Sequence, residues 1–136
     1  MTILVDTDVL IDLALDRQPH AEPAGRLVDL LEGSPGLGFI AWHTLSNFYY
    51  LVSPKTGKPE ARQFLLELCR FITVSETGTE SLRFAASLEM KDFEDALQVA
   101  AAAACGAEAI VTRNLQDYAR SPIRALEPVA ALDELF

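Results

Sequence analysis

The chain has 136 residues, half of them hydrophobic, which is enough for one folded domain with a buried core and excludes a disordered chain. Its 20 acidic and 11 basic residues give a formal net charge of -9, so it lacks the basic footprint of a nonspecific nucleic-acid binder. This charge is compatible with a cation site, with a basic partner, or simply with solubility.

The N-terminus and the cysteines bear on where the protein resides. Asp6 and Asp8 interrupt the apolar start that a signal peptide would need, and no apolar run approaches the roughly 20 residues of a membrane-spanning helix. Cys69 and Cys105 lack metal-ligand spacing and are expected to be buried free thiols in a reducing compartment. The sequence therefore predicts a cytoplasmic protein that does not associate with a membrane.

The first half of the chain alternates short strands with helices. Residues 2–5 form a compact β-branched run that predicts a strand, and residues 9–15 continue at helical spacing, with Asp8 as the expected N-cap. The elements expected next are a helix at 21–31, a strand at 38–41, a helix from about 44 to 52, a loop at 53–59, a helix at 60–70, a strand at 71–74 and a helix at 79–88.

Residues 92–118 carry the clearest local signals. Asp92 is expected to cap a helix with Asp95 at its third position, and Gly106 is expected to end that helix. Helical spacing predicts one apolar face, made of Phe93, Ala96, Leu97, Ala100, Ala101 and Ala104. A strand buried on both faces is predicted at 109–112, followed by a polar turn at 113–117. A short strand near 124–126 and a helical tail after Pro128 complete the chain.

This alternation predicts a single α/β domain over residues 1–136, with a parallel sheet and helices on both of its faces. In open parallel sheets, functional sites form outside the carboxyl ends of the strands. Asp6 ends the first predicted strand, whereas Asn114 and Asp117 follow the fourth. The fold is therefore expected to bring acidic side chains from distant parts of the chain to one edge of the sheet.

The acidic residues at these positions differ in how well local structure explains them. Asp8 and Asp92 suit N-caps, Asp95 suits the first turn of a helix, and Asp117 suits a turn. Asp6 directly follows a buried strand, where no capping role is expected to offset its desolvation.

A convergence of Asp6, Asp95 and Asp117 would favour a bound cation. Two charges about 4 Å apart repel by roughly 4 kcal/mol at an effective dielectric constant near 20, and a divalent cation relieves that repulsion. Oxygen-only ligands suit Mg²⁺ or Mn²⁺. Such a cation activates water for the hydrolysis of a phosphodiester, so the pattern predicts a metal-dependent nuclease.

Three segments together resemble the motif blocks of PIN domains: I-L-V-D-T-D-V-L-I-D, D-F-E-D-A-L-Q-V-A-A-A and I-V-T-R-N-L-Q-D-Y. The resemblance covers essentially the whole chain. It implies a three-layer α/β/α sandwich with a central parallel sheet of four to five strands, a carboxylate cluster that binds Mg²⁺ or Mn²⁺, and a homodimer. Many bacterial members are VapC-type toxins, which are ribonucleases neutralised by an antitoxin. The resemblance thus implies an RNA substrate and an antitoxin protein as partners.

The resemblance also assigns roles to individual residues. Asp6 and Asp95 match the first and third metal-binding acids, and Asp117 is expected to share the last position with Asn114, which stands where other members carry an acid. Asn47, in T-L-S-N-F-Y-Y, stands where a Glu is usual and leaves the site one charge poorer, as in a similar PIN subgroup.

Several neighbours of these residues are expected to assist. Arg113, directly after the fourth predicted strand, is expected either to contact a substrate phosphate or to pair with a nearby acid. Trp42, Phe48, Tyr49 and Tyr50 are expected in the core or at a dimer contact. The residues expected to support the site are Asn47, Asn114, Asp92, Thr7 and Asp8.

Two alternatives to a nuclease remain open at this stage. Asn47 favours a catalytically weak or inactive PIN fold that binds RNA or protein. The D-T-D-V segment also fits a haloacid-dehalogenase-like phosphatase, with Asp6 as nucleophile and Asp8 as general acid. That class needs a further glycine-containing acidic motif, which K-D-F-E-D at residues 91–95 does not match.

Overall fold

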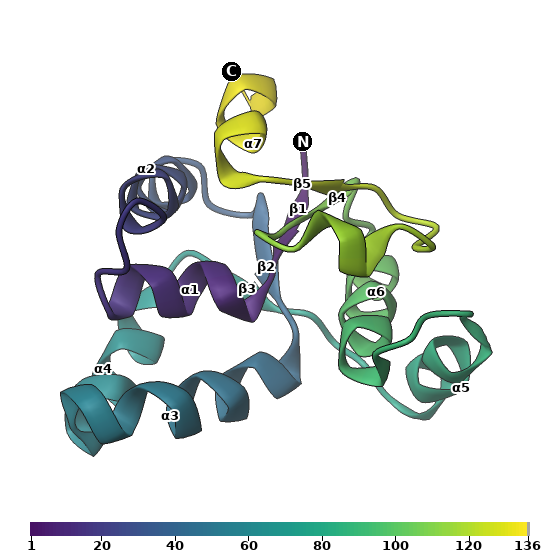
Figure 1. The fold of residues 1–136 in the computed structure, drawn as a ribbon, viewed down its shortest axis with the longest axis horizontal. Coiled ribbons are helices and arrows are strands. Elements are labelled where there is room, and N and C mark those ends of the chain that lie inside the picture. Colours follow the sequence, from purple (N-terminus) through teal and green to yellow (C-terminus); the bar gives the residue numbers. More distant parts are fainter. Residues whose placement is uncertain (136) are drawn as a thin grey trace.

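The computed structural model describes residues 1–135 and is built around a five-stranded sheet with strand order β3-β2-β1-β4-β5 (Figure 1). Every neighbouring pair of strands is parallel. The central strand β1 is fully buried, as its unbroken apolar run predicts. The strands are β1 (Ile3–Val5), β2 (Gly38–Ile40), β3 (Thr73–Val74), β4 (Ala109–Val111) and β5 (Ala125–Leu126).

Helices cover both faces of this sheet, which confirms the predicted three-layer α/β/α architecture. In Figure 1, α1 to α4 lie on one side of the sheet and α5 and α6 on the other. The larger core cluster packs α1 to α4 and α7 against the sheet, and a smaller one packs α6 against its opposite face. The helices are α1 (Thr7–Ala14), α2 (Ala21–Glu32), α3 (Trp42–Thr56), α4 (Lys58–Leu68), α5 (Thr79–Ser87), α6 (Phe93–Cys105) and α7 (Pro128–Leu135), with a 3-10 turn η1 (Leu115–Tyr118).

The start of α1 corrects the predicted cap. Asp6, and not Asp8, is the N-cap residue, because its backbone is extended and its carboxylate accepts a hydrogen bond of 2.7 Å from the Thr7 amide. Asp8 lies in the first turn of the helix instead. Asp6 therefore follows β1 directly and also caps α1, a role that the sequence pattern did not predict for it.

The predicted loop at 53–59 is wrong, because α3 runs through Pro54 and α4 begins at Lys58. Stacking of Phe48 on Phe64, with ring centroids 4.9 Å apart, holds the two helices together. Pro54 has no amide hydrogen to donate to the carbonyl of Tyr50 one turn earlier, and α3 nevertheless continues past it to Thr56. Gly57 makes the break between the helices, since its φ of 108° is in a region that favours glycine.

The two caps of α6 are the predicted ones, but its buried face agrees only in part with the predicted apolar face. Asp92 accepts from the Glu94 amide, and Gly106 ends the helix in the left-handed region with φ of 70°. Phe93 and Ala104 are exposed, although both were predicted to face inward. The helix contacts the sheet on one side and α5 on another, so its buried residues cover a wider arc: Ala96, Gln98, Val99, Ala100, Ala101 and Ala102.

The expected burial of the two cysteines needs correction. Cys69 is exposed and Cys105 only half-buried, because both lie at helix ends where the core is not continuous. Of the aromatic residues, Phe48 lies in the core, whereas Trp42 is 68% exposed and Tyr50 is 73% exposed. Among the described residues, no helix is both long and apolar enough to cross a lipid bilayer.

Candidate functional site

Asp6 lies at the carboxyl end of β1, with only 8% of its surface exposed. Its Oδ1 accepts from the Thr7 amide at 2.7 Å and from Gln98 Nε2 at 3.2 Å. Its Oδ2 accepts from Thr112 Oγ1 at 2.9 Å and from the Tyr118 hydroxyl at 3.0 Å. Burial raises the pKa of Asp6, and the hydrogen bonds from Thr112, Tyr118 and Thr7 oppose that rise. A carboxylate has about four acceptor positions, so all of them are occupied here.

A buried polar network fixes the orientation of Asp6. Gln98 on α6 is 1% exposed, and its Nε2 lies 3.2 Å from Thr7 Oγ1 and 3.1 Å from Thr44 Oγ1. The two threonine hydroxyls are 2.9 Å apart. Since α1, α3 and α6 each contribute one of these residues, the packing of three helices determines where the carboxylate points.

Asp95, at the third position of α6, lies beside Asp6 as predicted. The Tyr118 hydroxyl that donates to Asp6 is also 3.4 Å from Asp95 Oδ1, so one phenol lies between the two carboxylates. Burial, followed by repulsion from Asp92, Asp6 and Asp117, raises the pKa of Asp95 to about 7. Three other carboxylates therefore lie close enough to repel Asp95, and a bound cation would relieve that repulsion.

Asp117 lies farther out than the other two acids. It is exposed on η1 and lines, with Asp92 and Asp95, a pocket of about 380 Å³ next to Asp6. The pocket also contains Lys91 and Arg120. Within residues 1–135, no three His, Cys, Asp or Glu side chains lie close enough to form a ready-made ligand group. The structure thus gathers the predicted trio in one region without arranging it as a compact cluster.

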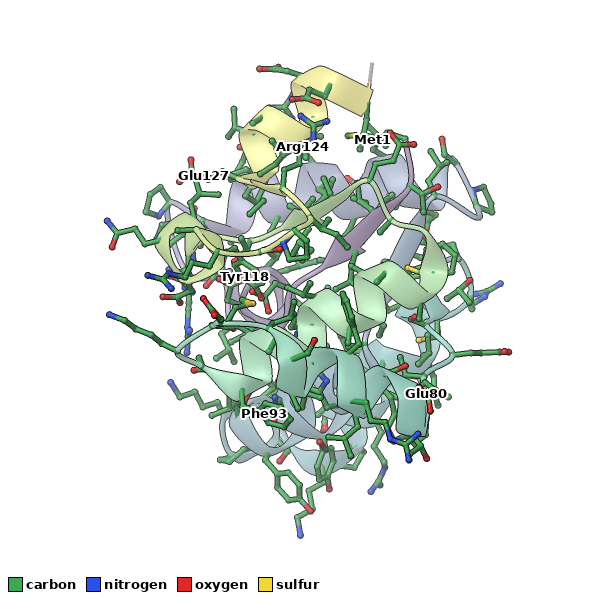
Figure 2. All side chains as sticks on the ribbon, turned by 90° about the vertical axis from the view of Figure 1, so that its right-hand side faces the viewer. Met1, Glu80, Phe93, Tyr118, Arg124 and Glu127 are labelled. Atoms are coloured by element: carbon green, nitrogen blue, oxygen red, sulfur yellow. The ribbon has the colours of Figure 1, made fainter. Side chains whose placement is uncertain are left out.

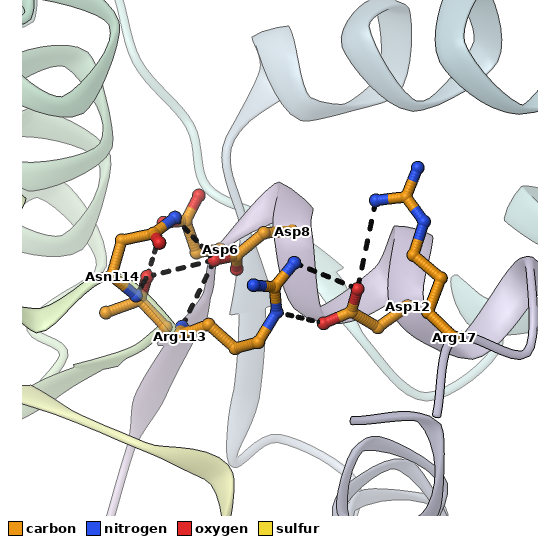
Figure 3. Close-up of polar contacts among 7 residues, drawn as sticks. Asp6, Asp8, Asp12, Arg17, Arg113 and Asn114 are labelled. Atoms are coloured by element: carbon orange, nitrogen blue, oxygen red, sulfur yellow. Dashed lines mark hydrogen bonds and ion pairs between the residues drawn. The ribbon is translucent and has the colours of Figure 1, made fainter. Parts of the chain in front are cut away.

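Asp8 and Asn114 contact each other near Asp6 (Figure 3). Asp8 Oδ2 accepts from Asn114 Nδ2 at 3.0 Å and from the Arg113 amide at 3.1 Å. Its Oδ1 is buried and has no hydrogen-bond partner in the described part of the chain. Burial, followed by repulsion from Asp6, raises the pKa of Asp8 to about 7. Asn114 therefore contacts Asp8, and its amide group restrains that carboxylate.

The Arg113 side chain is engaged with Asp12 on α1 (Figure 3). Its Nε and one terminal nitrogen donate to the two carboxylate oxygens of Asp12 at 2.5 and 3.1 Å. Asp12 is 1% exposed, so this pair neutralises a buried charge. Of the two roles considered for Arg113, the structure displays the pairing with an acid.

Asn47 brings a further acid into the region. Its Nδ2 donates a hydrogen bond of 2.7 Å to Glu94 Oε1 in the first turn of α6. Burial, followed by repulsion from Asp92 and Asp6, raises the pKa of Glu94. His43 also lies near Asp6, and burial lowers its pKa while Asp6 opposes that change. A carboxylate thus lies next to the amide at position 47.

Sequence reasoning missed several residues that hold this site together. Gln98 had a signal, because it is a polar residue among the buried alanines of α6, three positions after Asp95. Thr112 directly follows β4 as Asp6 follows β1, which also could have indicated a role. Nothing in the local pattern pointed to the hydroxyl of Tyr118.

A family model of the PIN domain matches residues 2–116, so the chain belongs to the PIN domain family. This class agrees with the parallel sheet and with the acidic side chains gathered at its carboxyl edge. A search of curated proteins finds no match.

Several solved toxin–antitoxin structures share the fold. VapBC2 from Rickettsia felis, bound to a DNA fragment from its promoter, matches with a TM-score of 0.72 and 17% identity over 93% of this chain and 98% of that one. A toxin–antitoxin complex from Klebsiella pneumoniae matches with a TM-score of 0.71 and 24% identity over 93% and 98%. VapC20 of Mycobacterium tuberculosis, a toxin that cleaves the sarcin–ricin loop, matches with a TM-score of 0.63 and 18% identity, over 80% of this chain and 87% of that one. At these identities, the likeness establishes a common fold.

Proposed function

We propose that this chain is a metal-dependent endoribonuclease that hydrolyses RNA phosphodiester bonds, and that it is the toxin of a type II toxin–antitoxin pair. One observation carries the proposal: Asp6 at the end of β1 and Asp95 at the start of α6 share the hydroxyl of Tyr118. The PIN domain membership supports the same reading. The family match is to PIN domains, which speaks against the phosphatase alternative.

The donors in this region fit Mg²⁺ or Mn²⁺. They are carboxylate and amide oxygens, and Asp8 Oδ1 is buried without a hydrogen-bond partner among the described residues. We assign Asp6, Asp95 and Asp117 to hold the cation. A bound cation would lower the pKa of the attacking water and polarise the phosphodiester.

The other residues of the site prepare these acids and the substrate. Thr7 and Gln98 orient Asp6, and Asp92 orders the first turn of α6 by accepting from two of its amides. Asn114 restrains Asp8, and Asn47 holds Glu94 beside the site. Lys91 and Arg120 give the adjoining pocket positive charge for phosphates. Arg113 would contact a phosphate only by leaving Asp12.

The proposed partners are an antitoxin and a second copy of the chain. The Rickettsia and Klebsiella structures are toxin–antitoxin complexes, which supports an antitoxin partner. A groove of about 680 Å³, with apolar side chains from α1, α2 and α4, offers a surface for it. The exposed side chains of Trp42, Tyr50 and Leu51 on α3 offer one for a homodimer. The proposed place of action is the cytoplasm.

The test is Asp6→Asn, assayed with RNA and Mn²⁺. The change keeps the size of the side chain and removes its charge, so cleavage is expected to fall by about 100-fold or more. Asp29→Asn, on the exposed face of α2, is the matched control and should cleave as the wild type does. Unchanged cleavage by the Asp6 variant would remove the site assignment.

A binding module without nuclease activity is the second candidate, because an amide at position 47 reduces the charge of the site. Titration of Mn²⁺ or Mg²⁺ against RNA turnover separates the two candidates. A nuclease shows turnover that saturates with the metal and disappears in chelator. A binding module binds RNA or protein but does not cleave RNA at any metal concentration.

A further inference from the structure

We propose that the Tyr118 hydroxyl competes with a divalent cation for the space between the Asp6 and Asp95 carboxylates, so that cation binding must displace it. The inference rests on the proposed function, because it requires that these two acids bind a cation. It assigns to Tyr118 a role in setting the metal affinity of the site.

The packing of Tyr118 places its hydroxyl between the Asp6 and Asp95 carboxylates. The residue is 4% exposed and belongs to the core cluster that includes Leu4, Val99 and Ile110, and this packing directs its ring toward the two acids. Figure 2, seen from the side of α5 and α6, shows Tyr118 above Phe93, the first residue of α6. The hydroxyl lies 3.0 Å from Asp6 Oδ2 and 3.4 Å from Asp95 Oδ1.

A single hydroxyl serves two carboxylates poorly. It carries one hydrogen, which it can donate fully to only one acceptor at a time. The shorter distance indicates that Asp6 receives it, and Asp95 is left with the weaker contact. Repulsion between the two acids is therefore only partly relieved by the phenol, whereas a divalent cation would relieve it more completely.

The other donors to Asp6 leave no alternative position for a shared cation. Thr7 donates from the backbone at the helix N-terminus, and Gln98 and Thr112 donate from fully buried side chains. Of the four donors, only Tyr118 also contacts Asp95. A cation bound by both acids consequently has to replace the phenol rather than one of the other three.

This competition predicts a particular thermodynamic pattern for Tyr118→Phe. The hydrogen bond to Asp6 would exist only in the metal-free protein, so its loss should lower the melting temperature without metal and leave the metal-saturated protein unchanged. Mn²⁺ should bind the variant roughly tenfold more tightly, because no hydrogen bond to a charged group has to be broken. A purely structural role would lower both melting temperatures and leave the affinity as it is.

The experiment measures Mn²⁺ binding by calorimetry, and melting temperatures with chelator and with saturating Mn²⁺. It uses the wild type, Tyr118→Phe, Thr112→Val and Tyr49→Phe. Thr112→Val removes a donor to Asp6 that stays in place when the cation binds, so it should lower both melting temperatures alike. Tyr49→Phe removes a hydroxyl from the aromatic pair with Tyr50 on α3 and should change neither quantity.

Equal or weaker Mn²⁺ binding by Tyr118→Phe would overturn the inference while leaving the proposed metal site intact. Absence of saturable Mn²⁺ binding by the wild type would overturn both. A second measurement needs no variant: adding Mg²⁺ to the wild type should change the tyrosine ultraviolet difference spectrum, as the phenol leaves its carboxylate. A flat difference spectrum at saturating Mg²⁺ would also contradict the displacement.

Discussion

Asn47 Nδ2 donates a hydrogen bond of 2.7 Å to Oε1 of Glu94, which joins α3 to the first turn of α6 beside Asp6 and Asp95. The resemblance to PIN domains leads one to expect a carboxylate at position 47. The chain has an amide there, and this amide binds the Glu94 carboxylate of another helix. The negative charge that Asn47 lacks is present one side chain away, on Glu94.

This relationship predicts that Glu94→Gln weakens Mn²⁺ binding by about threefold to tenfold, since one negative charge near Asp6 is lost. The glutamine carbonyl can still accept from Asn47, so the fold should be unaffected. Calorimetric titration measures the change, and Glu80→Gln on α5 is the control because that side chain is exposed and pairs with Arg83. Equal affinities for the two variants would show that Glu94 plays no part in cation binding.

Gln98→Leu is expected to lower the free energy of unfolding by about 1–3 kcal/mol, because the buried Asp6 carboxylate loses a donor. Thr7 and Thr44 lose their contact with the same amide. Urea denaturation measures the change. Gln63→Leu, which removes an exposed glutamine from α4, should stay within about 0.5 kcal/mol of the wild type. Similar values for both variants would mean that the buried network contributes little.

Arg113→Met is expected to lower the free energy of unfolding by about 2–3 kcal/mol, because the buried Asp12 would lose two hydrogen bonds and keep only the longer ion pair with Arg17, at 3.9 Å. Adding Asp12→Leu should recover much of that loss, since it removes the buried charge. Arg26→Met is the matched control, because Arg26 and its partner Glu22 are both exposed. A fully stable Arg113 variant with weakened RNA binding would instead assign this arginine to the substrate.

The stability of the metal-free protein should fall as the pH rises from 3.8 to about 7. Burial, followed by repulsion from Asp92, Asp6 and Asp117, raises the pKa of Asp95 to about 7 from its ordinary 3.8, so the folded protein binds a proton that the unfolded chain releases. The resulting stabilisation is complete below pH 3.8 and lost as the pH rises through about 7. Asp8 acts in the same direction.

Melting temperatures in chelator, between about pH 5 and pH 8, test this dependence. The comparison is between the wild type and Asp95→Asn, because the lowered pKa of His43 acts in the opposite direction in both proteins and cancels. The variant should show a shallower decline with pH. Parallel curves would show that Asp95 does not carry the effect.

The sequence by itself determined the succession of strands and helices along the chain, the caps of α6, and the proximity of Asp6 and Asp95. These follow from local patterns and from one rule of topology: the carboxyl ends of parallel strands share an edge of the sheet. Local patterns gave wrong predictions where two structures suited the same residues about equally well. Both Asp6 and Asp8 suit a cap, and the composition of residues 53–59 suits a loop until the packing of Phe48 on Phe64 is considered.

Only the tertiary structure decided what surrounds Asp6. Its side-chain donors Gln98, Thr112 and Tyr118 are 92, 106 and 112 residues away along the chain. Which of their atoms point at the carboxylate depends on the rotation of α6 against the sheet and on the path of η1. Those features are fixed by packing across the core, which short-range sequence patterns do not encode.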